Sequence, residues 1–338
     1  MKAIYLVNTG ASNSAFKLRE TEKPFPKAHE VLIKVHSFGL NFADVMARKG
    51  MYQDAPPIPA LLGYDVAGTV EQVGSGVTHL LVGDRVTAMT RFGGYAEYAV
   101  TDARAAAKIP ENISFADATA LTTQYCTAYY AAAVAVNLFP GNKVLIHSGA
   151  GGVGSALIQF AKWRGCEIFS TAGSSSKLEL LKQQGVQHPI NYIEQDFEDE
   201  IKQLTKGEGV DVIFDAVGGS YVRKGFRSLA AGGRIVCYGA ADLSSKNIFG
   251  KISALLAFGI YHPVMFMTSS KGIIGLNMLR IADNKPEALQ HCLNQVIQLT
   301  EQGVFKPTIG KVFNASEIAA AHDFLESRKS TGKIAVTW

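Results

Sequence analysis

The chain has 338 residues, a net charge of +4, 47% hydrophobic residues and 18% charged residues. This length corresponds to about two domains, and the apolar fraction is high enough to build their cores without disulfide bonds. Nucleic-acid-binding proteins usually carry a clustered basic stripe. No basic run occurs here, so we expect no nucleic-acid partner. The low charged fraction favours additional buried surface, such as a subunit interface.

The cysteines and the apolar segments indicate a cytoplasmic protein. Four cysteines are scattered singly and form no C-x-x-C pair, which disfavours a zinc ribbon or a redox pair and is typical of a reducing compartment. The N-terminal MKAIYLVNTG lacks the apolar run of a signal peptide. The longest apolar run, Ile252–Met267, is 16 residues long and is interrupted by His262 and Pro263. About 20 residues are needed to span a bilayer, so we expect no stable membrane insertion.

The first 110 residues consist mainly of short apolar or alternating segments that end at Gly or Pro. Beyond an N-terminal apolar strand, we predict strands at Val31–Leu40, Tyr64–Val73, Asp84–Met89 and Tyr95–Val100. Short strands at this spacing indicate a barrel-like or sandwich-like domain.

The composition changes at Ser114, where an Ala-rich segment predicts a helix. After Pro140 and Gly141, apolar strands alternate with amphipathic helices, which indicates a parallel sheet with right-handed crossovers. The tail then predicts a helix over 286–303 followed by strand, helix and strand. We therefore expect an α/β protein in which residues 1–124 and 278–338 form one domain and residues 125–277 form a doubly wound domain.

A glycine-rich turn marks the start of this second domain. Gly149, Gly151 and Gly154 follow the pattern G-x-G-x-x-G between a predicted strand at 143–147 and a predicted helix at 155–165. Such glycines let the backbone approach a pyrophosphate at the start of a helix. The motif alone is weak, but the strands and helices that follow support it. We predict that a dinucleotide contacts Ala150, Gly151, Gly152, Val153 and Gly154.

The end of the next strand indicates which dinucleotide binds. NAD-binding units place a carboxylate there for the ribose 2′-hydroxyl, but this chain has Gly173, Ser174 and, three residues on, Lys177. Hydroxyl and ammonium groups suit a 2′-phosphate, whose oxygens accept charge-assisted hydrogen bonds. We therefore predict NADPH, with Tyr192 flanking the phosphate. Lys177 as a solvated lysine and Tyr192 as a strand tyrosine remain the alternatives.

Several stretches together carry a family resemblance along nearly the whole chain. They are GLNFADVMARKGMY (39–52), LLGYDVAGTVEQVGSGV (61–77), VGDRV (82–86), GGYAEYAV (93–100), the glycine-rich segment 143–165, GVDVIFDAVGG (209–219) and ESRKSTGKIAV (326–336). In this order they resemble the zinc-free quinone oxidoreductase (zeta-crystallin) group of the medium-chain dehydrogenase/reductase superfamily. The stretch 39–52 and GVQHPINYIEQDFEDEI at 185–201 are especially similar to its vesicle-amine-transport-protein-like branch. The resemblance implies a GroES-like catalytic domain, a Rossmann domain and NADPH-dependent reduction of quinones or related enones.

The positions of the zinc ligands in related enzymes argue against a metal here. Zinc-dependent relatives carry Cys where this chain has Asn41, His where it has Tyr64, and a third ligand near Thr123. Asn, Tyr and Thr are not a zinc ligand set. We expect no bound metal.

The resemblance also implies residue roles. Asn41 would bridge the nicotinamide ribose and the substrate, Asp44 would share its helix face, and Tyr52 would stack on a flat ring and donate a hydrogen bond. Structural roles for each of them remain open. Met46 stands where the family often has a further Tyr, which puts the usual quinone preference in doubt. Further cofactor contacts are implied at Thr127, Val217, Tyr238, Gly239, Gly275, Leu276, Asn277 and Arg328.

Partners and alternatives follow from the same features. We expect a small flat carbonyl or quinone substrate and a homodimer joined through the last strand of the parallel sheet, KGIIGLN, because an exposed edge invites pairing. A non-catalytic NADPH-binding sensor or structural protein of the same fold is the alternative function. A membrane-associated partner protein is a further possibility, which the small net charge disfavours.

Overall fold

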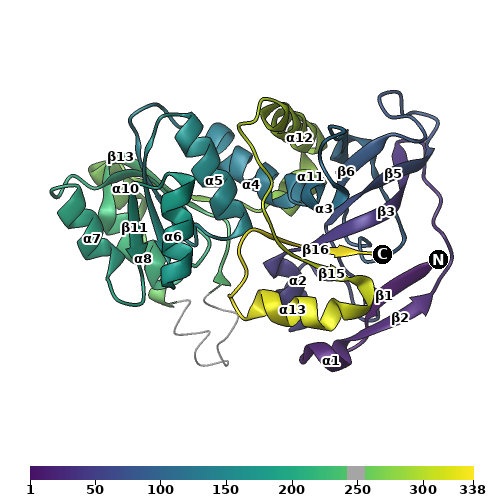
Figure 1. The fold of residues 1–338 in the computed structure, drawn as a ribbon. Coiled ribbons are helices and arrows are strands. Elements are labelled where there is room, and N and C mark those ends of the chain that lie inside the picture. The colour runs from purple at the N-terminus through teal and green to yellow at the C-terminus, as the bar shows by residue number, and fades with distance from the viewer. Residues whose placement is uncertain (242–255) are drawn as a thin grey trace. The chain divides into compact units, whose positions relative to one another are not determined.

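The computed structural model describes residues 1–241 and 256–338, which form two compact units (Figure 1). Unit 1 comprises Met1–Cys126 and Met278–Trp338, and unit 2 comprises Thr127–Asn277. The expected α/β class, with a β-rich unit and a parallel-sheet unit, is confirmed. Residues 252–255, the first part of the long apolar run, lie outside the described residues.

Unit 1 is built on a seven-stranded sheet in the order β15-β16-β3-β5-β6-β8, with β7 also paired to β3, and on a three-stranded sheet β2-β1-β4. Apolar side chains from both sheets and from α13 fill one core. The strands are β1 (Lys2–Leu6), β2 (Phe16–Glu20), β3 (Glu30–Leu40), β4 (Ala60–Leu61), β5 (Asp65–Val73), β6 (Arg85–Met89), β7 (Tyr98–Asp102), β8 (Ala106–Lys108), β15 (Ile309–Asn314) and β16 (Lys333–Thr337).

Unit 1 also contains helices and 3₁₀ turns between its strands. They are α1 (Ser12–Ala15), α2 (Phe42–Arg48), α3 (Phe115–Ala118), α11 (Met278–Asn284), α12 (Pro286–Glu301) and α13 (Ile318–Glu326), with the 3₁₀ turns η1 (Ala103–Ala105) and η5 (Ala315–Glu317). Ser114 caps α3 by accepting a hydrogen bond from the Asp117 N–H at 3.0 Å.

The Ala-rich segment after α3 differs from the single helix expected from its sequence. It contains two π-helical stretches, η2 (Leu121–Tyr125) and η3 (Tyr130–Ala135), with the short α4 (Cys126–Tyr129) between them. Turns of π-helix are rare and frequently occur at functional sites. Here η2 presents Thr122 and Thr123 to a buried carboxylate, as described below.

Unit 2 contains a six-stranded sheet in the order β11-β10-β9-β12-β13-β14, in which all neighbouring strands are parallel. The predicted parallel sheet is therefore confirmed, with the strand order reversing between β9 and β12. Its strands are β9 (Lys143–Ile146), β10 (Glu167–Ala172), β11 (His188–Asn191), β12 (Val210–Asp215), β13 (Leu229–Cys237) and β14 (Gly272–Gly275), and its helices are α5 (Gly152–Trp163), α6 (Ser175–Gln184), α7 (Phe197–Leu204), α8 (Ser220–Ser228) and α10 (Pro263–Ser269).

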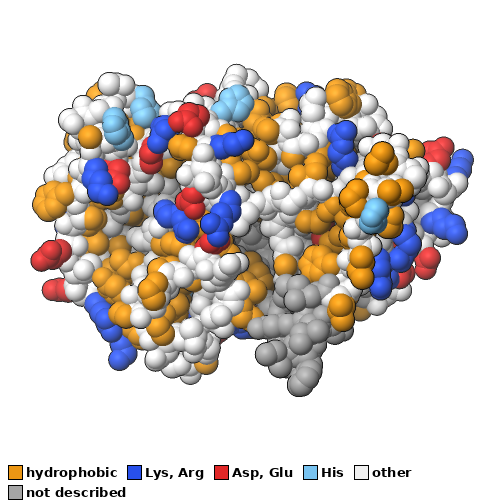
Figure 2. Space-filling model, turned by 180° about the vertical axis from the view of Figure 1, so that it is seen from behind, with side chains coloured by type: hydrophobic (Ala, Val, Ile, Leu, Met, Phe, Trp, Pro, Cys, Tyr) orange, Lys and Arg blue, Asp and Glu red, His pale blue; other side chains and the backbone are white. Residues whose placement is uncertain are grey.

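Two surface properties bear on the function classes considered above. Lys and Arg side chains lie beside Asp and Glu side chains on the face shown in Figure 2, without a broad field of one sign. Within the two described ranges, no helix combines the length and the apolar character that crossing a membrane requires.

Candidate active site

Three neighbouring strands of unit 1 bring together three polar residues from distant parts of the sequence. In the pairing of β3 with β5, Gly39 lies opposite Asp65, and in the pairing of β3 with β16, Leu40 lies opposite Ile334. Asn41 directly follows β3, Asp65 begins β5 and Lys333 begins β16. The sheet register therefore places Asn41, Asp65 and Lys333 at the same end of the sheet.

Asp65 is the centre of this group. Its Oδ2 accepts hydrogen bonds from Asn41 Nδ2 at 2.5 Å and from Lys333 Nζ, and its Oδ1 accepts from Thr122 Oγ1, from the Thr123 N–H at 2.9 Å and from Thr123 Oγ1. Lys333 Nζ also donates to Asn41 Oδ1 at 2.9 Å. A buried charge is tolerated when it is paired and hydrogen-bonded in this way. Asp65 and Lys333 therefore bind both polar atoms of the Asn41 side-chain amide, Nδ2 and Oδ1.

Gly39 makes room for the lysine in this network. A Cβ atom at position 39 would lie only 2.2 Å from Lys333 Cε and 3.1 Å from Thr119 Cβ. Any side chain at this position would therefore displace the ammonium group from Asn41 and Asp65. No local sequence pattern indicates this role for Gly39.

Asp44 occupies a second buried position, next to Asn41. Asn41 is the N-cap of α2, and Asp44 Oδ2 accepts a hydrogen bond from the Asn41 N–H at 2.8 Å, while Asp44 Oδ1 accepts from the Gly63 N–H at 3.2 Å. The side chain is fully buried, and this burial raises the pKa of the carboxyl group to about 7. Asp44 thus fixes the backbone at Asn41 and can change its charge near neutral pH.

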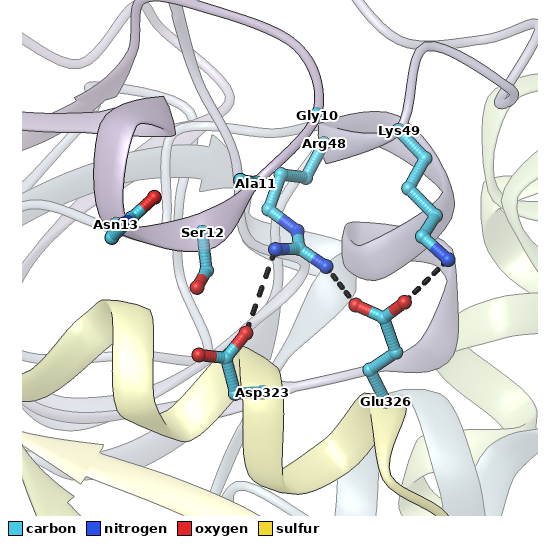
Figure 3. Close-up of a pocket in the computed structure, with 8 residues that line it drawn as sticks. All are labelled: Gly10, Ala11, Ser12, Asn13, Arg48, Lys49, Asp323 and Glu326. Carbon is cyan, nitrogen blue, oxygen red and sulfur yellow. Dashed lines mark hydrogen bonds and ion pairs between the residues drawn. The ribbon is translucent and has the colours of Figure 1, made fainter.

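Figure 3 shows how the other end of α2 is fixed. Arg48 is buried and pairs with Glu326 and, at 3.7 Å, with Asp323, both on α13. Lys49 also pairs with Glu326. Because these ion pairs tie α2 to α13, they restrict movement of the helix that begins at Asn41.

Two tyrosines stand beside these carboxylates. Tyr52 is half-buried, whereas Tyr64 is 4% exposed, and their rings meet edge to face with centroids 6.3 Å apart. Burial raises the pKa of both phenols, and the Asp44 charge raises them further. Both hydroxyl groups therefore keep their protons at neutral pH.

The positions compared with zinc ligands in the sequence have other partners in the structure. Asn41 and Thr123 both bind Asp65, and Tyr64 packs between Tyr52 and Phe92. Within residues 1–241 and 256–338, no group of three or more His, Cys, Asp or Glu side chains is placed to hold a metal ion. Burial raises the pKa of the nearby Cys126 thiol, so this thiol keeps its proton at neutral pH.

In unit 2 the glycine-rich turn connects β9 to α5. Gly151 is the N-cap of α5, so the first N–H groups of this helix point towards the turn. A Cβ atom at Gly149 would lie 2.0 Å from Ser170 Oγ, and one at Gly154 would lie 2.5 Å from the Ser148 carbonyl oxygen. Residues 150–154 thus lie at the carboxyl end of the sheet, next to the point where strand order reverses, which is where nucleotides bind in such sheets.

The structure brings the residues expected around a 2′-phosphate together at the ends of β10 and β11. A Cβ atom at Gly173 would lie 2.4 Å from the Tyr192 hydroxyl oxygen, so Tyr192 covers the backbone there. Ser174 caps α6 by accepting from the Lys177 N–H at 3.4 Å, and Lys177 is half-buried. The cluster combines a helix N-terminus, hydroxyl groups and an ammonium group.

The remaining expected cofactor residues lie in both units. Asp215, at the end of β12, accepts from the Val217 N–H at 2.8 Å and the Gly218 N–H at 3.0 Å, which fixes the loop that contains Val217. In unit 2, Thr127 and Leu276 are buried, Val217 and Tyr238 are half-buried, and Gly239, Gly275 and Asn277 are exposed. Arg328 is an exposed residue of unit 1 with a φ of +59°, directly after α13.

Sequence reasoning missed two residues of the site, Asp65 and Lys333. Both lie in stretches that resemble the family, 61–77 and 326–336, and neither is singled out by the sequence. The available signal was a charged residue at the start of an otherwise apolar strand, in both β5 and β16. Such a residue is often a solvated strand end, and only the sheet register shows that the two charges meet.

Comparison with known proteins agrees with this architecture. Residues 27–111 match the family model "Alcohol dehydrogenase GroES-like domain", and residues 152–294 match the model "Zinc-binding dehydrogenase". The chain thus belongs to the medium-chain dehydrogenase/reductase superfamily of oxidoreductases, which confirms the resemblance inferred from the sequence.

Individual relatives cover nearly the whole chain. The synaptic vesicle membrane protein VAT-1 homolog of Danio rerio is 33% identical over 99% of this chain and 70% of its own length. The solved structure of Escherichia coli quinone oxidoreductase complexed with NADPH is 28% identical, with a TM-score of 0.87 and coverage of 100% of both chains. The structure of CurK enoyl reductase is 29% identical, with a TM-score of 0.87 and coverage of 99% of this chain and 98% of CurK.

Proposed function

We propose that this protein transfers a hydride from NADPH to an acceptor that is already electrophilic, a quinone or an α,β-unsaturated carbonyl compound, without a metal ion. The observation that carries the proposal is the Asn41–Asp65–Lys333 network. In this network the ammonium group of Lys333 binds Asp65 and Asn41, and Asn41 is one of the positions compared with zinc ligands. Quinone oxidoreductase and enoyl reductase among its structural relatives support the same reaction class.

NADPH is the proposed cofactor because of the cluster at the end of β10. Ser174, Lys177 and Tyr192 offer two hydroxyl groups and an ammonium group around Gly173, and no carboxylate stands in the segment Gly173–Lys177 to bind a ribose 2′-hydroxyl. The 2′-phosphate distinguishes NADPH from NADH and is an acceptor for these donors. The NADPH complex of the Escherichia coli relative supports this assignment.

The charge of Lys333 supports metal independence. Its ammonium group already neutralises Asp65 and donates to Asn41, so a divalent cation at the same oxygens would lie beside a buried positive charge. The acceptor must therefore be reactive without a Lewis acid. Quinones and conjugated enones meet this condition because hydride addition gives a delocalised anion.

The chain's own residues then serve to orient the substrate and to stabilise charge. When bound, NADPH supplies the hydride; with one proton from solvent, a quinone becomes a hydroquinone and NADPH becomes NADP⁺. Asn41, held by Lys333 and Asp65, is assigned to positioning the acceptor and the ribose. Asp44 holds the Asn41 backbone, and the half-buried Tyr52 donates a hydrogen bond to the oxygen on which negative charge develops.

The test of this proposal is NADPH oxidation measured over a panel of quinones, enals and enones. We expect steady turnover with at least one of these classes, and much slower turnover with NADH. Binding of NADPH without oxidation in the presence of every acceptor would instead identify a non-catalytic NADPH-binding protein.

We also propose a homodimer joined through unit 2. Among the described residues, β14 pairs only with β13 and so forms an edge of the sheet, as the sequence predicted. The nearby segment exposes large apolar side chains, among them Ile260 at 92% and Met267 at 78%. Exposed strand edges and contiguous apolar patches both favour association. Light scattering at micromolar concentration should give twice the monomer mass.

We propose a cytoplasmic location because the cysteines form no disulfide bonds. Cys126, Cys166, Cys237 and Cys292 are all free thiols in the structure. Free, unpaired cysteines are typical of reducing compartments.

A further inference from the structure

The hydroxyl group of Tyr64 is buried beside the half-buried phenol of Tyr52. Tyr64 is 4% exposed, and among residues 1–241 and 256–338 its oxygen makes no regular hydrogen bond. An unsatisfied buried hydroxyl group lowers stability by an amount comparable to a lost hydrogen bond, and such groups occur mainly where they serve a function. The position of Tyr64 therefore needs an explanation other than packing.

The phenol that packs against Tyr64 is that of Tyr52. Their rings meet edge to face, at an interplanar angle of 77°, and the centroid of the Phe92 ring lies 5.0 Å from that of Tyr64. The Tyr64 hydroxyl group is the more deeply buried of the two and makes no regular hydrogen bond with the described residues, whereas Tyr52 is half-buried. We therefore take Tyr64 as the donor and Tyr52 as the acceptor of this pair. The direction of the pKa contribution agrees with this order, because burial raises the pKa of Tyr52 and Tyr64 lowers it.

The difference in exposure assigns different roles to the two tyrosines. Tyr52 is half-buried and can meet a substrate, whereas the Tyr64 hydroxyl lies beneath the surface and cannot do so without rearrangement. An O–H group whose oxygen accepts a hydrogen bond becomes a stronger donor itself, because hydrogen bonds in a chain polarise one another. Tyr64 would then act on the substrate only through Tyr52.

We propose that Tyr64 is a positioning residue that donates a hydrogen bond to the Tyr52 oxygen when the acceptor substrate is bound, and so strengthens the hydrogen bond from Tyr52 to the substrate oxygen. This inference rests on the proposed function, in which Tyr52 donates to the reduced oxygen. The two phenols are already in contact without substrate, and the hydrogen bond between them shortens when the substrate oxygen accepts from Tyr52. No proton is transferred between the two phenols.

The test is a double-mutant cycle with Tyr52→Phe, Tyr64→Phe and the double variant, assayed with NADPH and 1,4-naphthoquinone. Tyr64→Phe should lower kcat by about two- to tenfold, the effect of one neutral hydrogen bond, with the KM for NADPH unchanged. The double variant should be no slower than Tyr52→Phe alone. Tyr125→Phe is the matched control, because it also removes one buried phenol hydroxyl of unit 1, which donates to the Lys306 carbonyl.

Two kinetic outcomes would overturn the inference. Tyr64→Phe with wild-type kcat beside a slow Tyr52→Phe would show that Tyr64 does not assist Tyr52. Effects that multiply in the double variant would show that Tyr64 acts independently of Tyr52.

An NMR measurement separates this inference from the proposed function. In protein labelled with ¹³Cζ-tyrosine, the Tyr52 resonance, assigned from its loss in Tyr52→Phe, should shift in Tyr64→Phe and stay in place in Tyr125→Phe. An unshifted resonance would overturn the pairing of the two phenols even if quinones are reduced. A wild-type protein that oxidises no NADPH would refute the proposed function, while the resonance would still decide the pairing.

Discussion

Lys333 and Asp65 form an ion pair in which neither side chain is exposed, although 268 residues separate them in the sequence. Removing one partner of such a pair leaves the other charge buried and uncompensated, which costs about 3–5 kcal/mol. The pair also holds the Asn41 amide, so its loss affects the site as well as stability.

Lys333→Met should therefore lower the free energy of unfolding by about 3–5 kcal/mol, measured by urea denaturation. The double variant Asp65→Asn with Lys333→Met should recover part of this loss, because it removes both charges. Lys329→Met, on an exposed lysine of the same C-terminal region, is the control. A loss below about 1 kcal/mol for Lys333→Met, as for a surface ion pair, would contradict this description of the pair.

The sequence predicted those parts of the protein that depend on local pattern. Alternation and glycine spacing are local, and they identified the strands of unit 2, most strands of unit 1 and the turn from Gly149 to Gly154. The strands β2, β4 and β8 of unit 1 were not predicted. The Asn41–Asp65–Lys333 network depends on the register between three strands, and no local pattern contains it. Tyr64 was considered only as a missing zinc ligand, because the burial of a single hydroxyl group depends on the packing around it.

The cofactor preference is tested at Lys177. Lys177→Ala should weaken NADPH binding by about 1–3 kcal/mol, the range of a charge-assisted hydrogen bond, and should leave NADH binding nearly unchanged. Isothermal titration calorimetry with both nucleotides measures the two effects. Lys182→Ala, on the exposed side of the same helix α6, is the control and should affect neither. Equal losses for NADPH and NADH would rule out a contact with the 2′-phosphate.

Removal of metal ions should not change the activity. The Lys333 ammonium group already neutralises the Asp65 carboxylate, and Asn41 and Thr123 are both bound to that carboxylate. We expect the same NADPH oxidation rate before and after exhaustive chelation, and less than stoichiometric zinc by elemental analysis. Activity that disappears on chelation and returns with added zinc would refute a metal-independent reaction.

The pH dependence of stability should report on Asp44. Its carboxyl group has an ordinary pKa of 3.8, and burial raises this pKa to about 7 in the folded protein. Between these values the folded state binds the proton and the unfolded state does not. The contribution of Asp44 to the free energy of unfolding therefore decreases as the pH rises from about 4 to about 7, by up to about 1.4 kcal/mol per pH unit.

Asp44→Asn removes this dependence. Its free energy of unfolding, relative to wild type, should rise across this pH window and become constant above it, as measured by urea denaturation at each pH. Asp199→Asn, on an exposed carboxyl group of α7, should give a constant difference. A constant difference for Asp44→Asn as well would mean that the Asp44 carboxyl titrates in its ordinary range.

Simple alcohols should not be substrates of the reverse reaction with NADP⁺. Oxidising an alcohol requires a group that accepts the hydroxyl proton as the hydride leaves. The two carboxylates next to Asn41, Asp44 and Asp65, are both 0% exposed, so neither can meet a substrate hydroxyl group. Asp65 also accepts from Lys333 and from Thr123, and Asp44 from the N–H groups of Asn41 and Gly63. Tyr52 and Tyr64 hold their protons, because burial raises the pKa of both phenols. A quinone needs no such base, since its reduced oxygen takes up a proton instead of losing one. Rates with ethanol or 2-propanol and NADP⁺ should therefore be negligible beside those with quinones and NADPH, and comparable rates would show that one of these groups acts as a base.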